Sequence, residues 1–261
     1  MTETALSLVA DLALATLRGT KTRTMRPITS QNSAVDGRAS RALFDSLDWG
    51  STAIFVDKGP SPAGNEGPYL HVPHRTEDST HRVYSRRWIG DVLWIREPAK
   101  VIESRGFLLD VGRQVKVRYE ADVAEAWVDY PARLSTPTIG HFLANGVHRE
   151  GARTLVRLKA VKPQRPVDIT EEEAIAEGVT QRAVPPFEDV RRLSCTNCGQ
   201  MRSQHVGQTL VCFGSAGRSF APQTLRGGFL WLYQGIYGPE SLTRWSWVYE
   251  WELLATSKET G

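Results

Sequence analysis

The chain has 261 residues, of which 41% are hydrophobic and 23% are charged, and this balance indicates a folded core rather than disorder. The net charge of +3 is too small to indicate nucleic-acid binding by itself. No run approaches the ~18 apolar residues that cross a bilayer, and the first residues lack the basic start of a signal peptide. We therefore expect a soluble, cytoplasmic protein without a membrane partner.

The first half of the chain predicts one helix followed by short strands. Apolar residues from Leu6 to Leu17 repeat at near-helical spacing, and Gly19 is a natural stop, so a helix is expected over 5–18. Strands are expected at 54–56, 69–72 and 92–95. The Pro- and Gly-rich stretch 59–68 reads as a loop between the first two strands.

The second half contains the clearest local signals. Thr170 and Glu173 form a capping box, and Gly178 closes the helix predicted over 169–177. Alternating apolar residues predict further strands at 115–119, 125–130, 153–161 and 247–253, and a short helix is expected at 229–238. Several strands and a few helices in mixed order give an α+β protein with a curved or closed sheet.

Basic residues gather just after Gly19. Lys21, Arg23 and Arg26 are interpreted either as a solvated strand edge or as a phosphate clamp. In a strict strand, Lys21 and Arg23 share one face, whereas Thr24 and Arg26 lie on the other. Aromatic residues are numerous, with eight tryptophans, which serve either as core residues or as stacking platforms for bases.

All three cysteines lie within residues 185–226, a segment rich in Arg, Gly, Ser and Pro that reads as an inserted module. Cys195, Cys198, His205 and Cys212 provide the ligands of a closed tetrahedral zinc site with a structural role. Zinc would also explain how a segment with so few apolar residues folds. The alternatives are free thiols or a redox pair formed by Cys195 and Cys198.

Four segments in order resemble the ASCH superfamily, especially its phage and prophage members. They are LRGTKTRTMRPI at 17–28, GDVLWIRE at 90–97, DITEEEAIAEGV at 168–179, and an aromatic C-terminal part ending in WSWVYEWE at 245–252. The resemblance implies a PUA-like β-barrel with flanking helices and a cleft beside the helix that ends at Gly19. It also implies substrates that are nucleic acids or nucleosides.

The expected organisation is a discontinuous PUA-like domain over 1–184 and 227–256, the inserted zinc-knuckle-like module at 185–226, and a flexible tail at 257–261. The leading hypothesis is binding of RNA, or of a modified nucleobase or nucleotide, through a basic cleft, with DNA as a second possible partner. The residues expected to contact it are Arg23, Arg26, Arg96, Trp94 and Trp247.

Two rival hypotheses stay open. One branch of the superfamily resembles amidohydrolases that act on N4-acetylcytidine, and its catalytic Lys, Thr and Glu correspond to Lys21, Thr24 and Glu177. The same three residues would serve an ASCH-type ribonuclease. Glu177 is also unusual in itself, because a carboxylate in the last turn of a helix is disfavoured by the helix dipole. The other rival is a phage regulatory or assembly partner without a nucleic-acid role.

Overall fold

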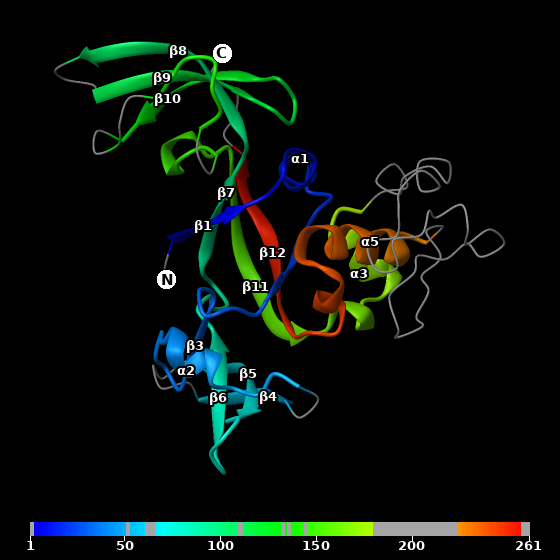
Figure 1. The fold of residues 1–261 in the computed structure, drawn as a ribbon. Coiled ribbons are helices and arrows are strands. Elements are labelled where there is room, and N and C mark those ends of the chain that lie inside the picture. Colours follow the sequence, from blue (N-terminus) through cyan, green and yellow to red (C-terminus); the bar gives the residue numbers. More distant parts are fainter. Residues whose placement is uncertain are drawn as a thin grey trace, which may run out of the picture. The chain divides into compact units, whose positions relative to one another are not determined.

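The computed structural model describes residues 3–50, 53–60, 66–108, 112–131, 134, 137–143, 146–179 and 224–256 (Figure 1). This part of the chain is mixed α+β and consists mostly of strands with few helices. The predicted α+β class is therefore confirmed. None of the helices in the described ranges has the length and apolar character needed to cross a membrane.

The strands are β1 (Glu3–Ser7), β2 (Arg23–Pro27), β3 (Ser33–Val35), β4 (Ile54–Pro60), β5 (Glu66–Pro73), β6 (Thr80–Ser85), β7 (Val92–Arg96), β8 (Ala99–Leu108), β9 (Gly112–Tyr119), β10 (Glu125–Tyr130), β11 (Thr154–Gln164) and β12 (Ser246–Thr256). The α-helices are α1 (Ala10–Leu17), α2 (Arg41–Asp45), α3 (Glu171–Ala176) and α5 (Leu225–Tyr237). Short 3₁₀ helices are η1 (Arg149–Gly151), η2 (Pro166–Asp168) and η6 (Pro239–Leu242).

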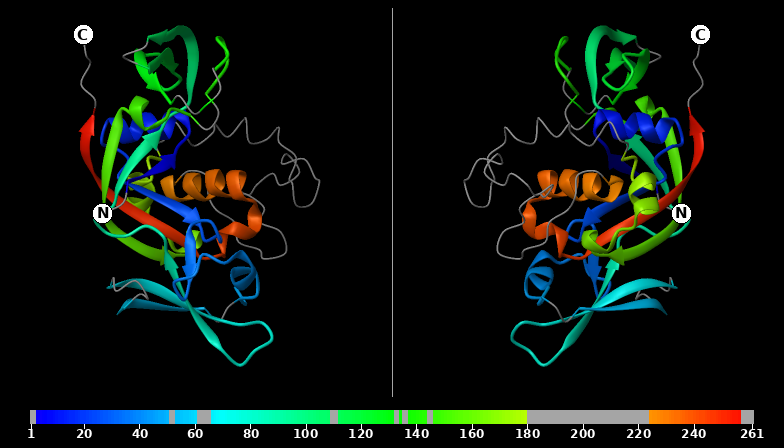
Figure 2. Two further views of the ribbon diagram at one scale, coloured as in Figure 1. Left: turned by 90° about the vertical axis from the view of Figure 1, so that its left-hand side faces the viewer. Right: turned by 90° about the vertical axis from the view of Figure 1, so that its right-hand side faces the viewer.

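The strands form three sheets. The largest is a curled sheet with the order β1-β7-β11-β12-β2, in which β1 runs parallel to β7 and β11 runs antiparallel to it (Figure 2). The second is a meander with the order β10-β9-β8. The third has the order β3-β6-β5-β4.

The chain divides into two compact units. Unit 1 comprises Met1–Thr22, Ile89–Lys159 and Glu250–Gly261, and unit 2 comprises Arg23–Trp88 and Ala160–Tyr249. Strands β11 and β12 each contribute residues to both units. The residues expected to form one discontinuous PUA-like domain are therefore distributed over two units.

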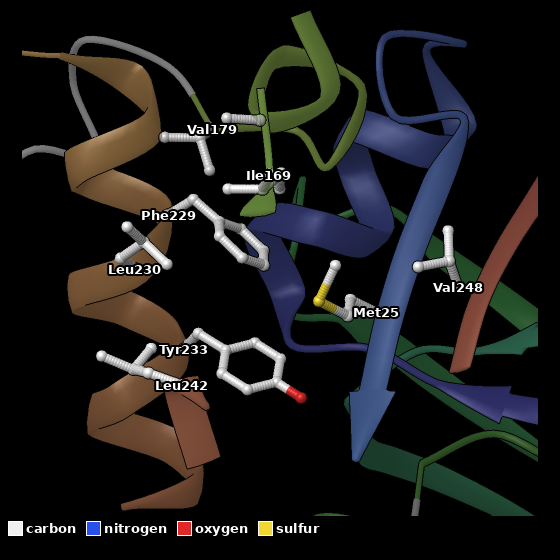
Figure 3. Packing of buried hydrophobic residues seen from close by; sticks show 9 residues of the cluster. Met25, Ile169, Val179, Phe229, Leu230, Tyr233, Leu242 and Val248 are labelled. Atoms are coloured by element: carbon white, nitrogen blue, oxygen red, sulfur yellow. The ribbon is translucent and has the colours of Figure 1, made fainter. Parts of the chain in front are cut away.

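Each unit has its own hydrophobic core. In unit 1, the β8–β9–β10 meander packs its inward face against Leu143 and Val147, which lie in the segment after β10. In unit 2, Phe229, Leu230 and Tyr233 of α5 share one buried cluster with Met25 of β2 and Val248 of β12, and the rings of Phe229 and Tyr233 point toward Met25 (Figure 3). The buried apolar faces of these elements stabilise each unit, because apolar area removed from water is the main favourable contribution to folding.

The prediction of a helix over 5–18 is wrong in its first part. Residues 3–7 form β1, whose parallel pairing with β7 places Glu3 opposite Val92, and the helix begins only at Ala10. The predicted end is confirmed, since Gly19 takes a left-handed φ of 73° directly after the helix. The loop expected at 59–68 is shorter than predicted, because β4 continues to Pro60 and β5 begins at Glu66.

The expected capping box at the start of α3 is confirmed. The Thr170 side chain accepts a hydrogen bond from the Glu173 backbone amide, and the Glu173 carboxylate accepts one from the Thr170 amide. Strand β10 has the bounds that the alternation predicted.

Candidate functional site

The basic segment after Gly19 enters the protein interior. Lys21 and Arg23 are only 1% and 2% exposed, and Thr24 is also buried. Within unit 1, the Lys21 ammonium lies 5.8 Å from the ring centroid of Trp251, and the Lys21 carbonyl accepts a hydrogen bond from the Trp251 indole at 3.2 Å. Lys21 is therefore fixed against the final strand rather than extended into solvent.

Arg23 links β2 to α3 inside unit 2. Its guanidinium forms an ion pair with Glu173 and donates a hydrogen bond to the Gln164 side chain at 2.6 Å. The Arg23 Nε also lies 3.6 Å from Oε1 of Glu177. Arg23 therefore neutralises two carboxylates in the interior, and its expected contact with phosphate stays a prediction.

Burial raises the pKa of the Glu173 carboxyl, but the hydrogen bonds from Gln164 and Arg23 more than offset this and hold the pKa at about 2. Glu173 is therefore ionised at neutral pH. It also closes the capping box, so the one carboxylate stabilises both the start of α3 and the guanidinium of Arg23.

Two further residues expected to contact nucleic acid are engaged within unit 2. Arg26 donates a hydrogen bond to the Tyr237 hydroxyl at 2.7 Å. Trp247 is completely buried, and its indole donates to the Ser33 hydroxyl at 2.8 Å. Trp247 is thus a core residue and presents no ring face to solvent.

The three candidate catalytic residues are all buried, with Glu177 at the C-terminal end of α3. Thr24 and Glu177 belong to unit 2, whereas Lys21 belongs to unit 1. Their convergence on one reacting group stays a prediction.

An open pocket of about 360 Å³ lies within unit 1. It is lined by Ser7, Leu8, Arg96, Pro98, Glu120, Phe142, Leu143 and Gly146. Ser7 of β1 stands directly opposite Arg96 of β7 in the parallel pair, so their side chains emerge on the same face of the sheet. The pocket is therefore located where β1 and β7 both end.

Arg96 is the cationic residue of this pocket. Its guanidinium lies over the ring of Trp94, with the guanidinium carbon 5.0 Å from the ring centroid. Trp94 precedes it by two positions on β7, so the strand geometry itself produces the stack. The Arg96 Nε is buried and has no hydrogen-bond partner among the described residues, so it has an unused donor.

The pocket is also lined by Phe142, which is 58% exposed. Main-chain hydrogen bonds fix the segment around it: Leu143 donates to Ala99, and Val101 donates to His141, both at 2.9 Å. Phe142 therefore offers an apolar ring to a ligand that enters the pocket.

Gly146 packs closely against the end of β7. Its φ is 79°, and a Cβ at this position would lie 2.6 Å from the Glu97 carbonyl oxygen and 2.9 Å from Cγ of Arg96. Only glycine fits both the backbone conformation and this close approach. The wall of the pocket therefore depends on residue 146 having no side chain.

Sequence reasoning named Trp94 and Arg96 but missed Phe142 and Glu120. Phe142 reaches the pocket through long-range pairing, in which it forms a bridge with Lys100. A single apolar residue between His141 and Leu143 gives no periodic pattern, so the sequence contained no signal that would have identified it.

The expected zinc ligands Cys195, Cys198, His205 and Cys212 lie outside the described residues. Among the residues that the structure does describe, no group of three or more His, Cys, Asp or Glu side chains is placed to hold a metal ion. The structural zinc site stays a prediction.

The chain was compared with protein families, curated proteins and solved structures. No family model, curated protein or solved structure matches it. The geometry of the two units is therefore the basis for the functional proposals that follow.

Proposed function

We propose that the protein binds single-stranded RNA or a modified nucleobase, and that the unit 1 pocket receives one base. The observation that carries this proposal is the arrangement of Arg96, stacked on Trp94, beside the exposed ring of Phe142. Proteins that bind single strands stack unpaired bases on aromatic rings and guanidinium planes. The PUA-like ASCH fold suggested by the sequence segments is part of the same proposal.

The size of the pocket supports a small ligand. Ligand pockets span roughly 300–1,000 Å³, and this one lies near the lower end at about 360 Å³. A pocket of this size suits a single base, while the sugar and phosphates of a strand remain in solvent.

Direct binding measurements test the proposal. Fluorescence anisotropy with a labelled single-stranded RNA at low salt should detect binding to the full chain. Phe142→Ala should weaken it roughly tenfold, because stacking on an aromatic ring contributes about 1–3 kcal/mol per base. Ile139→Ala is the matched control, since Ile139 is 57% exposed and is not among the residues lining the pocket.

Arg96→Ala should also weaken binding, whereas Lys159→Ala removes the same charge from an exposed position of β11 outside the pocket. Equal affinity of the Phe142→Ala and Ile139→Ala proteins would reject the pocket as the binding site. Absence of binding to RNA and to nucleosides at low salt would reject the function itself.

The hydrolase hypothesis is a second candidate, favoured by the burial of Lys21, Thr24 and Glu177. Incubation with N4-acetylcytidine and with single-stranded RNA, followed by product analysis, tests it. Turnover that is unchanged in Lys21→Ala would reject this catalytic assignment.

A further inference from the structure

The residues lining the unit 1 pocket include one cation and one anion. Arg96 supplies the positive charge and Glu120 the negative charge, while the other lining residues are uncharged. A phosphate group would be attracted by Arg96 but repelled by Glu120. The charges therefore favour a neutral ligand that carries hydrogen-bond acceptors and donors on neighbouring edges.

The backbone of Glu120 and the side chain of Arg96 are held by contacts within the pocket wall. The amide of Glu120 donates to the carbonyl of Pro98 at 3.0 Å, and Pro98 lines the same pocket. Arg96 is confined between the ring of Trp94 and Gly146, where a Cβ would approach within 2.9 Å of its Cγ. The contacts of Arg96 favour selectivity, because little entropy of this side chain is lost when a ligand binds.

We propose that this pocket is selective for guanine, an inference that rests on the base-binding function proposed above. Guanine presents two acceptors, N7 and O6, that match the fork of an arginine. Its N1–H and N2 amino groups are two donors that match a carboxylate. Phe142 provides the ring on which the purine stacks.

The other bases match Arg96 and Glu120 less well than guanine does. Adenine offers N7 and an amino group side by side, so it presents one acceptor and one donor to an arginine fork that needs two acceptors. Uracil has two carbonyl acceptors but a single N–H donor for a carboxylate. Cytosine can donate to the Glu120 carboxylate only through its amino group, so it forms fewer hydrogen bonds than guanine. Its single ring also offers a smaller stacking surface than a purine.

Calorimetric titration of the full chain with guanosine, adenosine, cytidine and uridine tests the selectivity. Guanosine should bind roughly tenfold more tightly than adenosine, the size expected for one good bidentate contact. Because nucleosides lack phosphate, their affinity should change little between low and moderate salt.

Two analogues assign the contacts. Inosine lacks the N2 amino group, so the preference for guanosine over inosine should disappear in Glu120→Ala, which removes both carboxylate acceptors. 7-Deazaguanosine lacks N7, so the preference for guanosine over this analogue should disappear in Arg96→Ala, which removes the donors of the fork. Lys159→Ala and Ile139→Ala should retain both preferences, and the thermal transition of each variant reports whether it is folded.

The outcomes separate the two proposals. Equal binding of all four nucleosides, or preference for another base, overturns guanine selectivity and leaves base binding in place. Binding of RNA without binding of any nucleoside also overturns the guanine assignment. Absence of binding to both RNA and nucleosides overturns the proposed function as well.

Discussion

The carboxylate of Glu97 is completely buried and lies 2.6 Å from the guanidinium of Arg153. Arg153 also contacts Asp122 at 2.8 Å and covers the ring of Tyr119, with 3.8 Å between the guanidinium carbon and the ring centroid. Glu97 directly follows Arg96, so this network fixes the chain at the point where the pocket wall begins.

Replacing Arg153 with alanine should strongly destabilise the protein. The substitution leaves the Glu97 carboxylate buried without its main counter-charge, which typically costs about 3–5 kcal/mol. Urea unfolding measures the loss. Arg157→Ala is the control, because Arg157 pairs with Glu252 at 3.5 Å and both side chains are close to half exposed, so about 0–1 kcal/mol is expected. Similar losses in both variants would contradict a dominant role of the buried pair.

Gly146 and Gly140 provide a second matched pair. Both have left-handed φ values, 79° and 88°, but a Cβ at Gly140 meets nothing within 4 Å. Gly140→Ala should cost only the conformational strain, about 1–2 kcal/mol. Gly146→Ala should cost clearly more and should also weaken ligand binding, because the Glu97 carbonyl and Arg96 must move. Thermal unfolding and RNA binding check both variants, and equal effects would exclude the close approach as the cause.

The contribution of Glu173 to stability should depend on pH. Its pKa of about 2 in the folded protein lies below the ordinary value of 4.5, so its stabilising effect is fully present above pH 4.5. The effect is lost as the pH falls from 4.5 toward 2. The difference in free energy of unfolding between the wild type and Glu173→Gln should therefore shrink over this range.

Glu172→Gln is the control for this pH series, since Glu172 is exposed in the same turn of α3. Hydrogen bonds at the start of the helix lower its pKa as well, but no ion pair with Arg23 is formed among the described contacts. Its substitution should change the pH dependence much less. An equal change of pH dependence in Glu172→Gln and Glu173→Gln would show that the helix terminus, rather than the ion pair with Arg23, causes the pH dependence of stability.

Purified protein should contain about one zinc per chain if Cys195, Cys198, His205 and Cys212 form the predicted site. Metal analysis by mass spectrometry measures the stoichiometry. Cys212→Ser should lower it, whereas His141→Ala, which changes a histidine outside residues 185–226, should not. Metal-free protein, or equal zinc in the wild type and Cys212→Ser, would reject the site.

Local signals in the sequence predicted those elements whose causes are local. The capping box of Thr170 and Glu173 involves residues three positions apart, and the structure has the helix where the box indicates. The alternation at 125–130 located β10 because one of its faces is turned to the core and the other to solvent.

Elements that depend on distant partners were missed. Strand β1 takes its conformation from parallel pairing with β7, almost ninety residues away, and its apolar residues fit a helical pattern as well. Strand β8 has register shifts at Val101/Glu103 and Arg105/Leu108, which interrupt the alternation. Helix α2 was missed for a different reason: none of its residues is buried, so no apolar face marks it in the sequence.

The residues of the candidate site also divide into those with a local sequence signal and those placed by distant partners. Trp94 and Arg96 were identified because they belong to a recognisable stretch at 90–97. Phe142 and Glu120 reach the pocket through backbone pairing with residues 98–101, which no sequence pattern revealed. The burial of Arg23 was also missed, because its two carboxylate partners lie about 150 residues further along the chain.

The hydrogen bonds that connect Gly140, His141, Leu143 and Val147 to residues 97–101 have a consequence for binding kinetics. They order the backbone around Phe142 during folding, so the Cα of Phe142 is already in place before any ligand arrives. Association then requires no slow rearrangement of the loop, and the encounter rate should be limited mainly by diffusion and orientation. Differences in affinity among ligands of this pocket should accordingly appear as differences in residence time.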